Sequence, residues 1–369
     1  MQTCIWKIAG LSCIALLCAR ADNSFIGPMQ TIKAHASTVP ANGDVNPYGV
    51  AVVPVTKGAL RQGHILVSNF NNSDNQQGTG TTIVQVAPGD GTVKLFAQLD
   101  ASTLPGTCPG GVGLTTALVA LQSGWVIVGS LPTSDGTSAT AQPGCLIVLD
   151  SSGRPVETLW GDGINGPWDM TALDGGSFAV LFVTNVLNGL SAQNSSGPSV
   201  SNTTVSGGTV LKIVLNTPER GMPTEVIRAV IASGFGETFD PDALVIGPTG
   251  VGLGANGTLY VADTLGNRIT AISDAVNRLV DGGTGTTVSG GGGLNAPLGL
   301  AIAPNGNIIT VNAGDGNMVE TTPTGTQVAV KAVDVTGTGG GTLFGLAIRP
   351  NGAGIYFVND GNNTLDLLH

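Results

Sequence analysis

The sequence predicts an all-β protein built from six repeated units of four strands that close into one ring. Three stretches near the C-terminus, 248–263, 297–312 and 343–359, repeat one pattern: an apolar run, a turn with Gly, a second apolar run, and then Asp or Asn. The 57 Gly and the low charge content of 10% are typical of short strands joined by tight turns. The hydrophobic content of 41% excludes a disordered chain. Repeats of this kind predict a six-bladed β-propeller with four-stranded blades.

Weaker copies of the same motif lie upstream and bring the number of units to six. Aligned on the third motif position, the units begin at Gly49, Gly111, Asp169, Gly250, Gly299 and Gly345. The spacings between them are 62, 58, 81, 49 and 46 residues. A second and a third apolar run follow each start, and a fourth run follows in five units. We therefore expect each unit to form one blade, with its first strand at the centre and its later strands further out.

The sixth unit has only three strands before the chain ends at His369. An unpaired sheet edge is a hazard that proteins usually cover. A spare apolar run, Met29–His35, precedes the first motif, and we expect it to pair outside Thr364–Leu367 and close the ring. Two polar, Gly-rich insertions, 188–208 and 281–293, are predicted to be surface loops, with a lid as the alternative for the first.

The first 21 residues have the pattern of an export signal. Lys7 supplies the positive charge, Ile8–Cys18 the apolar stretch, and Ala19-Arg20-Ala21 a small-x-small cleavage site. A lipoprotein signal is the alternative. The apolar stretch is shorter than the roughly 20 residues that span a bilayer. We expect a single domain at 22–369 that is secreted or periplasmic and monomeric, without a membrane span.

Charge and cysteine content narrow the function classes. Removal of the signal leaves 12 basic and 24 acidic residues, so the net charge of 12 − 24 = −12 argues against binding to nucleic acid or to anionic membranes. Two cysteines remain, Cys108 and Cys145, and in an oxidising compartment an even number predicts a disulfide. Its loop predicts a stabilisation of about 3–4 kcal/mol.

The three C-terminal units, 248–272, 297–321 and 343–367, resemble NHL repeats. The shared features are Pro-x-Gly-(Val/Leu)-x-(Leu/Ile), then Asn-Gly, then a strand like Tyr-Val-Ala-Asp, and then Gly-Asn before the third strand. The resemblance covers about the C-terminal third well and is weaker in the first three units. It implies an exported NHL-type six-bladed propeller, a fold that carries many functions and gives no chemistry by itself.

The second motif position is expected to form a ring around the central channel. The six residues at this position are Tyr48, Gly110, Trp168, Thr249, Leu298 and Phe344. Three aromatic side chains in a chain with 4% aromatic residues suggest a surface for sugars or flat apolar ligands. The alternative is a plug of packed rings that closes the channel.

A second, polar ring is expected where the second strands end. It consists of Asn69, Asn185, Asp263, Asn312 and Asn359, with Gly129 in the sixth place. Asn and Asp at such positions often cap the following turn. The alternative is a ring that contacts a ligand or binds Ca²⁺ weakly, and Asp169 and Asp263 would then be its carboxylates.

Catalytic candidates are few. The same fold is used by metal-dependent lactonases and streptogramin-type lyases, and the lactonases are expected to place acidic and Asn ligands at the second motif position, which is largely apolar here. His64 is the one histidine expected near a cleft, and Glu237, Asp240 and Asp242 form an acidic cluster before the fourth unit. We therefore predict a non-enzymatic binding scaffold without a cofactor, for a small molecule, glycan or protein at the channel mouth. The alternative is a divalent-metal-dependent hydrolase or lyase.

Overall fold

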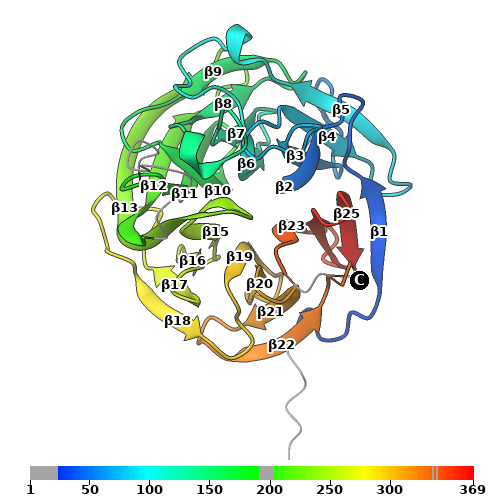
Figure 1. Cartoon of the computed structure of the whole chain (residues 1–369), viewed down its shortest axis with the longest axis vertical. Coiled ribbons are helices and arrows are strands. Elements are labelled where there is room, and N and C mark those ends of the chain that lie inside the picture. The colour runs from blue at the N-terminus through cyan, green and yellow to red at the C-terminus, as the bar shows by residue number, and fades with distance from the viewer. Residues whose placement is uncertain (1–23, 191–202, 335, 338–339) are drawn as a thin grey trace, which may run out of the picture.

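The computed structural model describes residues 24–190, 203–334, 336–337 and 340–369. Within them the chain forms six antiparallel sheets arranged as blades around a central axis, which confirms the predicted six-bladed propeller (Figure 1). The predicted export signal lies outside the described residues. Among the described helices, none has the length and apolar character needed to cross a bilayer.

The first four strands of blades one to five follow one another outward from the axis, whereas β14 of blade three folds back over the channel and blade six is completed by β1. Blade one contains β2 (Val45–Val52), β3 (Ile65–Asn71), β4 (Thr82–Val86) and β5 (Val93–Gln98). Blade two contains β6 (Leu114–Ala120), β7 (Val126–Ser130), β8 (Cys145–Leu149) and β9 (Pro155–Leu159). Blade three contains β10 (Gly166–Asp174), β11 (Phe178–Val186), β12 (Val205–Asn216), β13 (Thr224–Asp240) and β14 (Leu244–Ile246).

The C-terminal half repeats the arrangement more regularly. Blade four contains β15 (Pro248–Leu253), β16 (Leu259–Asp263), β17 (Arg268–Ile272) and β18 (Thr286–Gly290). Blade five contains β19 (Pro297–Ile302), β20 (Ile308–Asn312), β21 (Asn317–Thr321) and β22 (Gln327–Ala332). Blade six contains β23 (Leu343–Ile348), β24 (Ile355–Asn359), β25 (Thr364–Leu368) and, outermost, β1 (Ile32–Ser37).

The N-terminal strand closes the ring as expected. β1 pairs antiparallel with β25, with Ile32 opposite Leu368 and Ser37 opposite Thr364, so the first and last described strands lie side by side (Figure 1). The segment before β1 is held by Glu320 of blade five, whose carboxylate accepts hydrogen bonds from the backbone N–H groups of Phe25 and Ile26 at 2.7 and 2.8 Å. The closure therefore depends on blade five as well as on blade six.

Close backbone packing around the axis explains the glycine of the motif. A Cβ added at Gly299 would lie 1.9 Å from the carbonyl oxygen of Phe344, and one added at Gly345 would lie 2.2 Å from that of Tyr48. Gly250 faces Leu298 in the same way, at 2.3 Å. In blades four, five and six the third motif position is thus where the innermost strand meets the backbone of the next blade.

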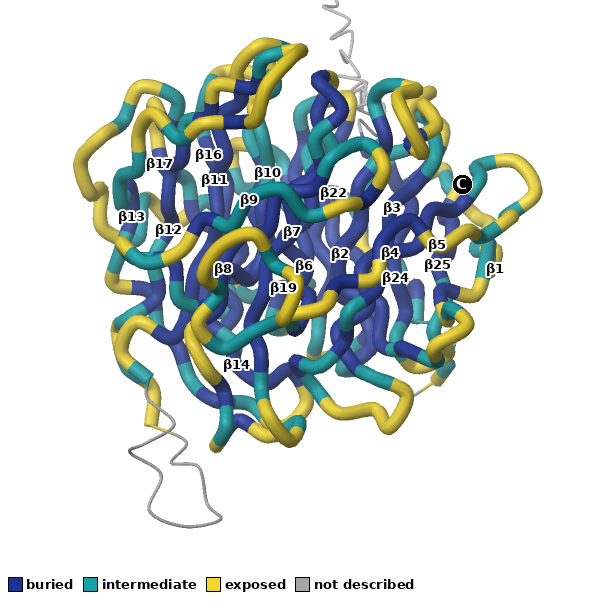
Figure 2. Tube along the Cα trace, turned by 90° about the horizontal axis from the view of Figure 1, so that it is seen from above, coloured by how far each residue is buried: buried dark blue, intermediate teal, exposed yellow. Residues whose placement is uncertain are grey.

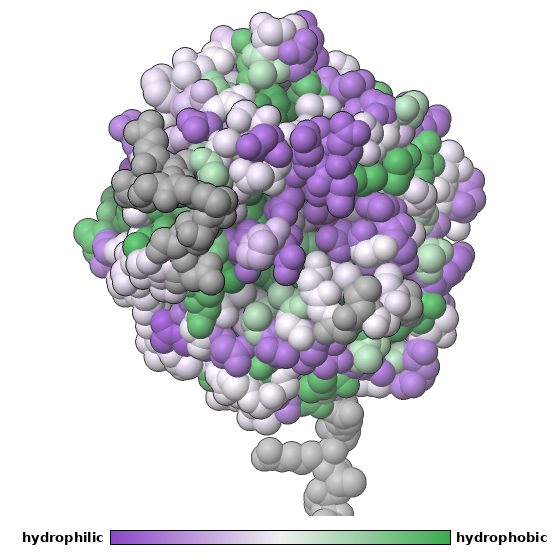
Figure 3. Space-filling view, viewed as in Figure 1, coloured by the Kyte–Doolittle hydropathy of each residue, from purple (hydrophilic) through white to green (hydrophobic). Residues whose placement is uncertain are grey.

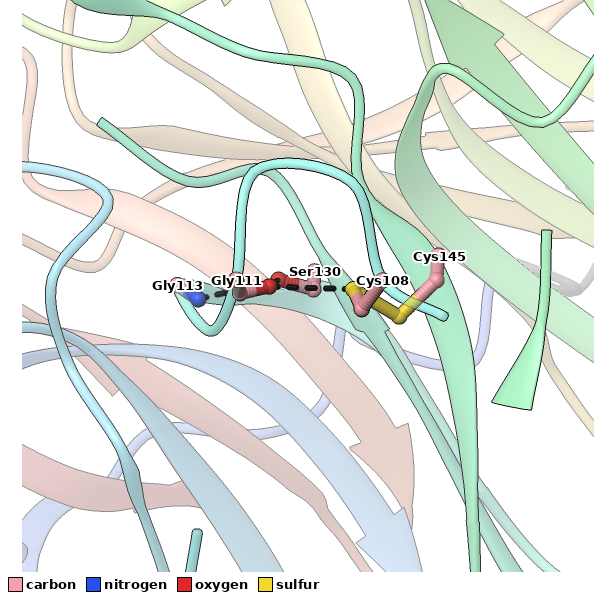
Figure 4. The surroundings of a disulfide bond; sticks show 5 residues. All are labelled: Cys108, Gly111, Gly113, Ser130 and Cys145. Carbon is pink, nitrogen blue, oxygen red and sulfur yellow. Dashed lines mark hydrogen bonds between the residues drawn. A yellow bond between two sulfur atoms is a disulfide. The ribbon is translucent and has the colours of Figure 1, made fainter. Parts of the chain in front are cut away.

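Blade two corrects the predicted register. Its innermost strand is Leu114–Ala120, so 109–113, the predicted start of that strand, is a loop. The loop is held by the disulfide between Cys108 and Cys145, which confirms that pairing, and by Ser130 (Figure 4). The Ser130 hydroxyl donates to Gly111 O at 2.8 Å and accepts from Gly113 N at 2.9 Å.

The two insertions behave differently. The first falls between β11 and β12, and its central residues 191–202 are not described. The second was predicted to be a loop, but Thr286–Gly290 forms β18, the outermost strand of blade four. The prediction failed because an outermost strand is half exposed and needs no apolar alternation.

Buried residues follow the inner strands, and exposed residues gather at the turns of both faces (Figure 2). The apolar clusters lie between neighbouring blades, such as the one that joins blades two and three. Two short 3₁₀ turns, η1 (Ala101–Thr103) and η2 (Ser138–Thr140), lie in connections.

Candidate functional site: the central channel

Aromatic rings close one end of the channel. Tyr48 and Phe344 stack with ring centroids 3.8 Å apart, and Trp168 lies 6.4 and 6.3 Å from them. All three side chains are at most 3% exposed. The structure therefore brings these predicted residues together as a packed plug. Tyr48 also stacks on Phe70 of the neighbouring strand β3, with ring centroids 4.5 Å apart.

A hairpin from blade three covers this plug. The segment Thr238–Ile246, called here the mouth hairpin, comprises the end of β13, a turn and β14. The indole Nε1 of Trp168 donates to Val245 O at 2.9 Å, from beneath it. The mouth hairpin reaches blades one and two, because Gln77 donates to Pro241 O at 2.6 Å and Ser138 donates to Leu244 O at 2.9 Å. The predicted mouth is thus roofed over by part of the chain itself.

The residues of the predicted polar ring are buried and cap turns. Asn185 accepts from the N–H groups of Asn165 and Gly166, both at 3.1 Å. Asp263 accepts from Gly266 N and forms an ion pair with Arg268 at 2.7 Å.

The other three members act as donors. The side-chain amides of Asn69, Asn312 and Asn359 donate to Thr38 O, Gly293 O and the Asp334 carboxylate. The sixth place belongs to Ser130 and not to Gly129, because Ser130 lies opposite Leu114 where Asn69 lies opposite Pro47.

The opposite half of the channel is a cavity of about 410 Å³. It is lined by the innermost strands of all six blades, beyond the aromatic plug. Its walls are mainly aliphatic, and the representative side chains are those of Val52, Leu118, Ala172, Leu253, Ile302 and Ile348. Two carboxyl groups line it, those of Asp169 and Asp174, and Asp174 caps loops by accepting from Gln122 N and Gly176 N.

Asp169 is the unusual group of this cavity. Its two oxygens accept from the backbone N–H groups of Met170 at 2.8 Å and Val251 at 3.2 Å, and the residue is 8% exposed. Burial raises the pKa of Asp169 to about 8, because desolvation of the charged form outweighs these two hydrogen bonds. At neutral pH the group is therefore mostly a neutral acid, able to donate a hydrogen bond.

The register of blade two reveals a second polar group that the sequence reasoning missed. Measured from Pro47, Leu114 and Pro167, the third motif position holds Gly49, Thr116 and Asp169. Blades one, four, five and six have Gly there, so blades two and three alone place a side chain at this level, and both side chains line the cavity. The Thr116 hydroxyl has no hydrogen-bond partner among the described residues. The sequence Thr115-Thr116 marks the true position in blade two, but the motif was aligned on the Gly-rich loop that precedes it.

The remaining candidates lie elsewhere. Burial and the nearby cations Arg61 and Lys94 lower the pKa of His64, which does not line the channel cavity. Glu237 is buried and accepts from the backbone N–H groups of Gly189 and Leu190. The described residues contain no group of three or more His, Cys, Asp or Glu side chains that could hold a metal ion.

Comparisons with known proteins agree on the fold. No protein-family model and no curated protein matches the chain. Among solved structures, a gluconolactonase from Xanthomonas campestris is similar with a TM-score of 0.51 and 13% identity, over 90% of this chain and 88% of that one.

Two further structures are similar to a comparable degree. A luciferin-regenerating enzyme has a TM-score of 0.55 and 10% identity, over 92% and 94% of the two chains. The PQQ-bound aldose sugar dehydrogenase of Streptomyces coelicolor has a TM-score of 0.54 and 16% identity, over 92% and 99%. At these identities the likeness shows a six-bladed propeller and assigns no family.

Proposed function

We propose that the protein is a non-enzymatic binding protein that holds a small, largely apolar molecule in the aliphatic half of its central channel. The observation that carries this proposal is the cavity itself: about 410 Å³, aliphatic walls, and the carboxyl group of Asp169 at its inner level. A concave apolar site with a few convergent polar groups is the usual form of a small-molecule site. This site lies on the other side of the aromatic plug from the channel mouth that the sequence predicted as the binding surface.

This carboxyl group defines the chemistry of the ligand. A neutral Asp169 donates a hydrogen bond. Aliphatic walls favour a hydrocarbon body. The ligand class is therefore an uncharged or weakly polar molecule with an acceptor oxygen, such as a ketone, ester or lactone. Export and an NHL-type ancestry remain part of the proposal, supported by the disulfide and by the repeats at 248–367.

The test uses a neutral apolar fluorophore, N-phenyl-1-naphthylamine, titrated into the protein. Ala301→Phe fills the cavity from blade five, whereas Ala332→Phe places the same ring on the exposed outermost strand of that blade. We expect at least tenfold weaker binding for Ala301→Phe and no change for Ala332→Phe. Equal binding by both variants, with unchanged melting temperatures, rejects the channel as the site.

The competing proposal is a divalent-metal-dependent hydrolase or lyase, supported by the enzyme names of the similar gluconolactonase and of the luciferin-regenerating enzyme. Such an enzyme would need Asp169 and Asp263 near one ion, yet Asp263 is engaged by Arg268 at 2.7 Å. Lactone hydrolysis that a chelator abolishes, and that Asp169→Asn abolishes as well, would replace the binding proposal with the enzymatic one.

A further inference from the structure

A second cavity lies on the face that carries the mouth hairpin. It has a volume of about 830 Å³ and is bounded by the turn of that hairpin and by loops of blades one and six. Hydrophilic residues gather across the middle of this face (Figure 3). Its lining includes five residues with side-chain oxygen atoms that matter here, namely Asn46, Asn71, Asp242, Thr342 and Asp360. This cavity is separated from the aliphatic channel by the aromatic plug.

Negative charge is concentrated in this cavity. Asp242 lies in the turn of the mouth hairpin, and Asp360 lies in the turn after β24 of blade six. Asp360 lies within electrostatic range of the carboxylates of Asp334 and Asp242. Among the described lining residues none is Lys, Arg or His. The carboxylates therefore repel one another without a basic side chain in the cavity wall to offset them.

Neutral oxygen atoms of the same wall lack hydrogen-bond partners. They are Oδ1 of Asn46, Oδ1 of Asn71 and Oγ1 of Thr342, among the described residues. The three residues are 7%, 2% and 5% exposed, so water does not replace the missing donors. Asn71 uses its amide nitrogen on Asn75 Oδ1 at 2.7 Å, which leaves its oxygen as the spare group. Buried oxygens without donors are the complement of a bound cation.

We propose that a divalent cation, Ca²⁺ by preference, binds in this cavity between Asp242 and Asp360, with Asn46, Asn71 and Thr342 supplying neutral oxygens. Two carboxylates with amide and hydroxyl oxygens form an all-oxygen set, which suits Ca²⁺ because it accepts six to eight oxygen ligands in flexible geometry. Mg²⁺ demands a tighter octahedron. With two carboxylates we expect weak affinity, with a Kd of about 10⁻⁴–10⁻³ M.

Such an ion would fasten the mouth hairpin. Asp242 belongs to blade three, whereas Asp360 and Asn46 belong to blades six and one. The hairpin already contacts blades one and two through Gln77 and Ser138. Val245 of the hairpin belongs to the same apolar cluster as Phe344 of blade six, and a cation would add a polar connection to that blade.

The experiment is calorimetric titration of CaCl₂ into the chelator-treated full chain, repeated with MgCl₂. We expect one Ca²⁺ per chain, weaker Mg²⁺ binding, and at least tenfold weaker Ca²⁺ binding in Asp242→Asn and in Asp360→Asn. Asp90→Asn removes the same charge from an exposed turn between β4 and β5 and should change nothing. Absence of binding at about 10 mM Ca²⁺, well above the expected range, overturns the proposal. Undiminished binding in both variants does so as well.

A second readout separates cation binding from a purely structural role of Asp360. If the proposal holds, Ca²⁺ raises the melting temperature of the wild type but not that of Asp360→Asn. A structural role alone would lower the melting temperature of the variant equally with and without Ca²⁺, which contradicts the proposal. Asp169→Asn should retain the Ca²⁺ effect, so failure of the channel proposal and failure of this one remain distinguishable.

Discussion

Replacement of Glu320 tests how the ring is closed. The Glu320 carboxylate is fully buried and accepts five hydrogen bonds. Its partners are Ser24 Oγ (2.7 Å), Phe25 N (2.7 Å), Ile26 N (2.8 Å), Asn305 Nδ2 (2.9 Å) and Asn307 Nδ2 (2.6 Å). Three of these donors belong to the N-terminal segment. One side chain of blade five therefore fixes the chain just before the closing strand.

Glu320→Gln preserves the shape and replaces one acceptor oxygen by a donor. Oε2 accepts from Ser24 Oγ and Ile26 N, so an amide nitrogen in that place leaves at least the buried N–H of Ile26 without an acceptor. A hydrogen bond to a charged group contributes about 1.5–3 kcal/mol, and an unsatisfied buried donor costs a similar amount. Since these contributions are not additive, we expect the free energy of unfolding to fall by about 2–4 kcal/mol.

Equilibrium unfolding in urea at pH 7 measures this loss. Glu219→Gln, at an exposed position, serves as the matched control and should remain within about 0.5 kcal/mol of the wild type. If Glu320→Gln also remains within that range, the carboxylate does not anchor the N-terminal segment and the reasoning fails.

The pH dependence provides an independent check of the same reasoning. Burial raises the pKa of Glu320, but the hydrogen bonds from Asn307, Phe25 and Asn305 outweigh burial and hold the pKa below its ordinary value. A lowered pKa gives stability that is present above the unfolded-state pKa of about 4.3 and is lost as the pH falls through the folded-state value. The difference between wild type and Glu320→Gln should therefore shrink at acidic pH. A constant difference would contradict the assignment.

Three further predictions concern the channel, the disulfide and the mouth hairpin. The pKa of Asp169, raised to about 8, gives stability that is present below about pH 4 and is lost by pH 8, so the wild type should lose stability relative to Asp169→Asn over this range in urea unfolding, and a constant difference would contradict this. Replacement of Cys108 and Cys145 by Ser opens a loop with a sequence separation of 37 and should lower the free energy of unfolding by about 4 kcal/mol, and a loss below about 1 kcal/mol would contradict this. Trp168→Phe removes the 2.9 Å hydrogen bond to Val245 O and should cost about 1 kcal/mol, with faster hydrogen exchange at 240–246 if that bond holds the hairpin.

The candidate site was predictable from the sequence only in part. The motif predicted that Tyr48, Trp168 and Phe344 would meet at the channel, and they do, but whether their faces are open depended on the mouth hairpin. No local pattern in Thr238–Ile246 indicates that it crosses from blade three to Gln77 and Ser138. Thr116 was missed because the Gly-rich loop 109–113 imitates the motif more closely than the true strand does.

The sequence by itself determined the number of blades, the order of the strands, the closing strand and the disulfide. These follow from local patterns: apolar alternation, turn residues and a repeat that places Gly where innermost strands meet. Only the tertiary structure decided which side chains surround the same space. Asp169 in blade three and Thr116 in blade two share a cavity because the ring brings all six innermost strands to one axis. Asp242 and Asp360 share another because a hairpin crosses that axis. Proximity between segments more than 50 residues apart is a consequence of ring closure, and a local pattern cannot express it.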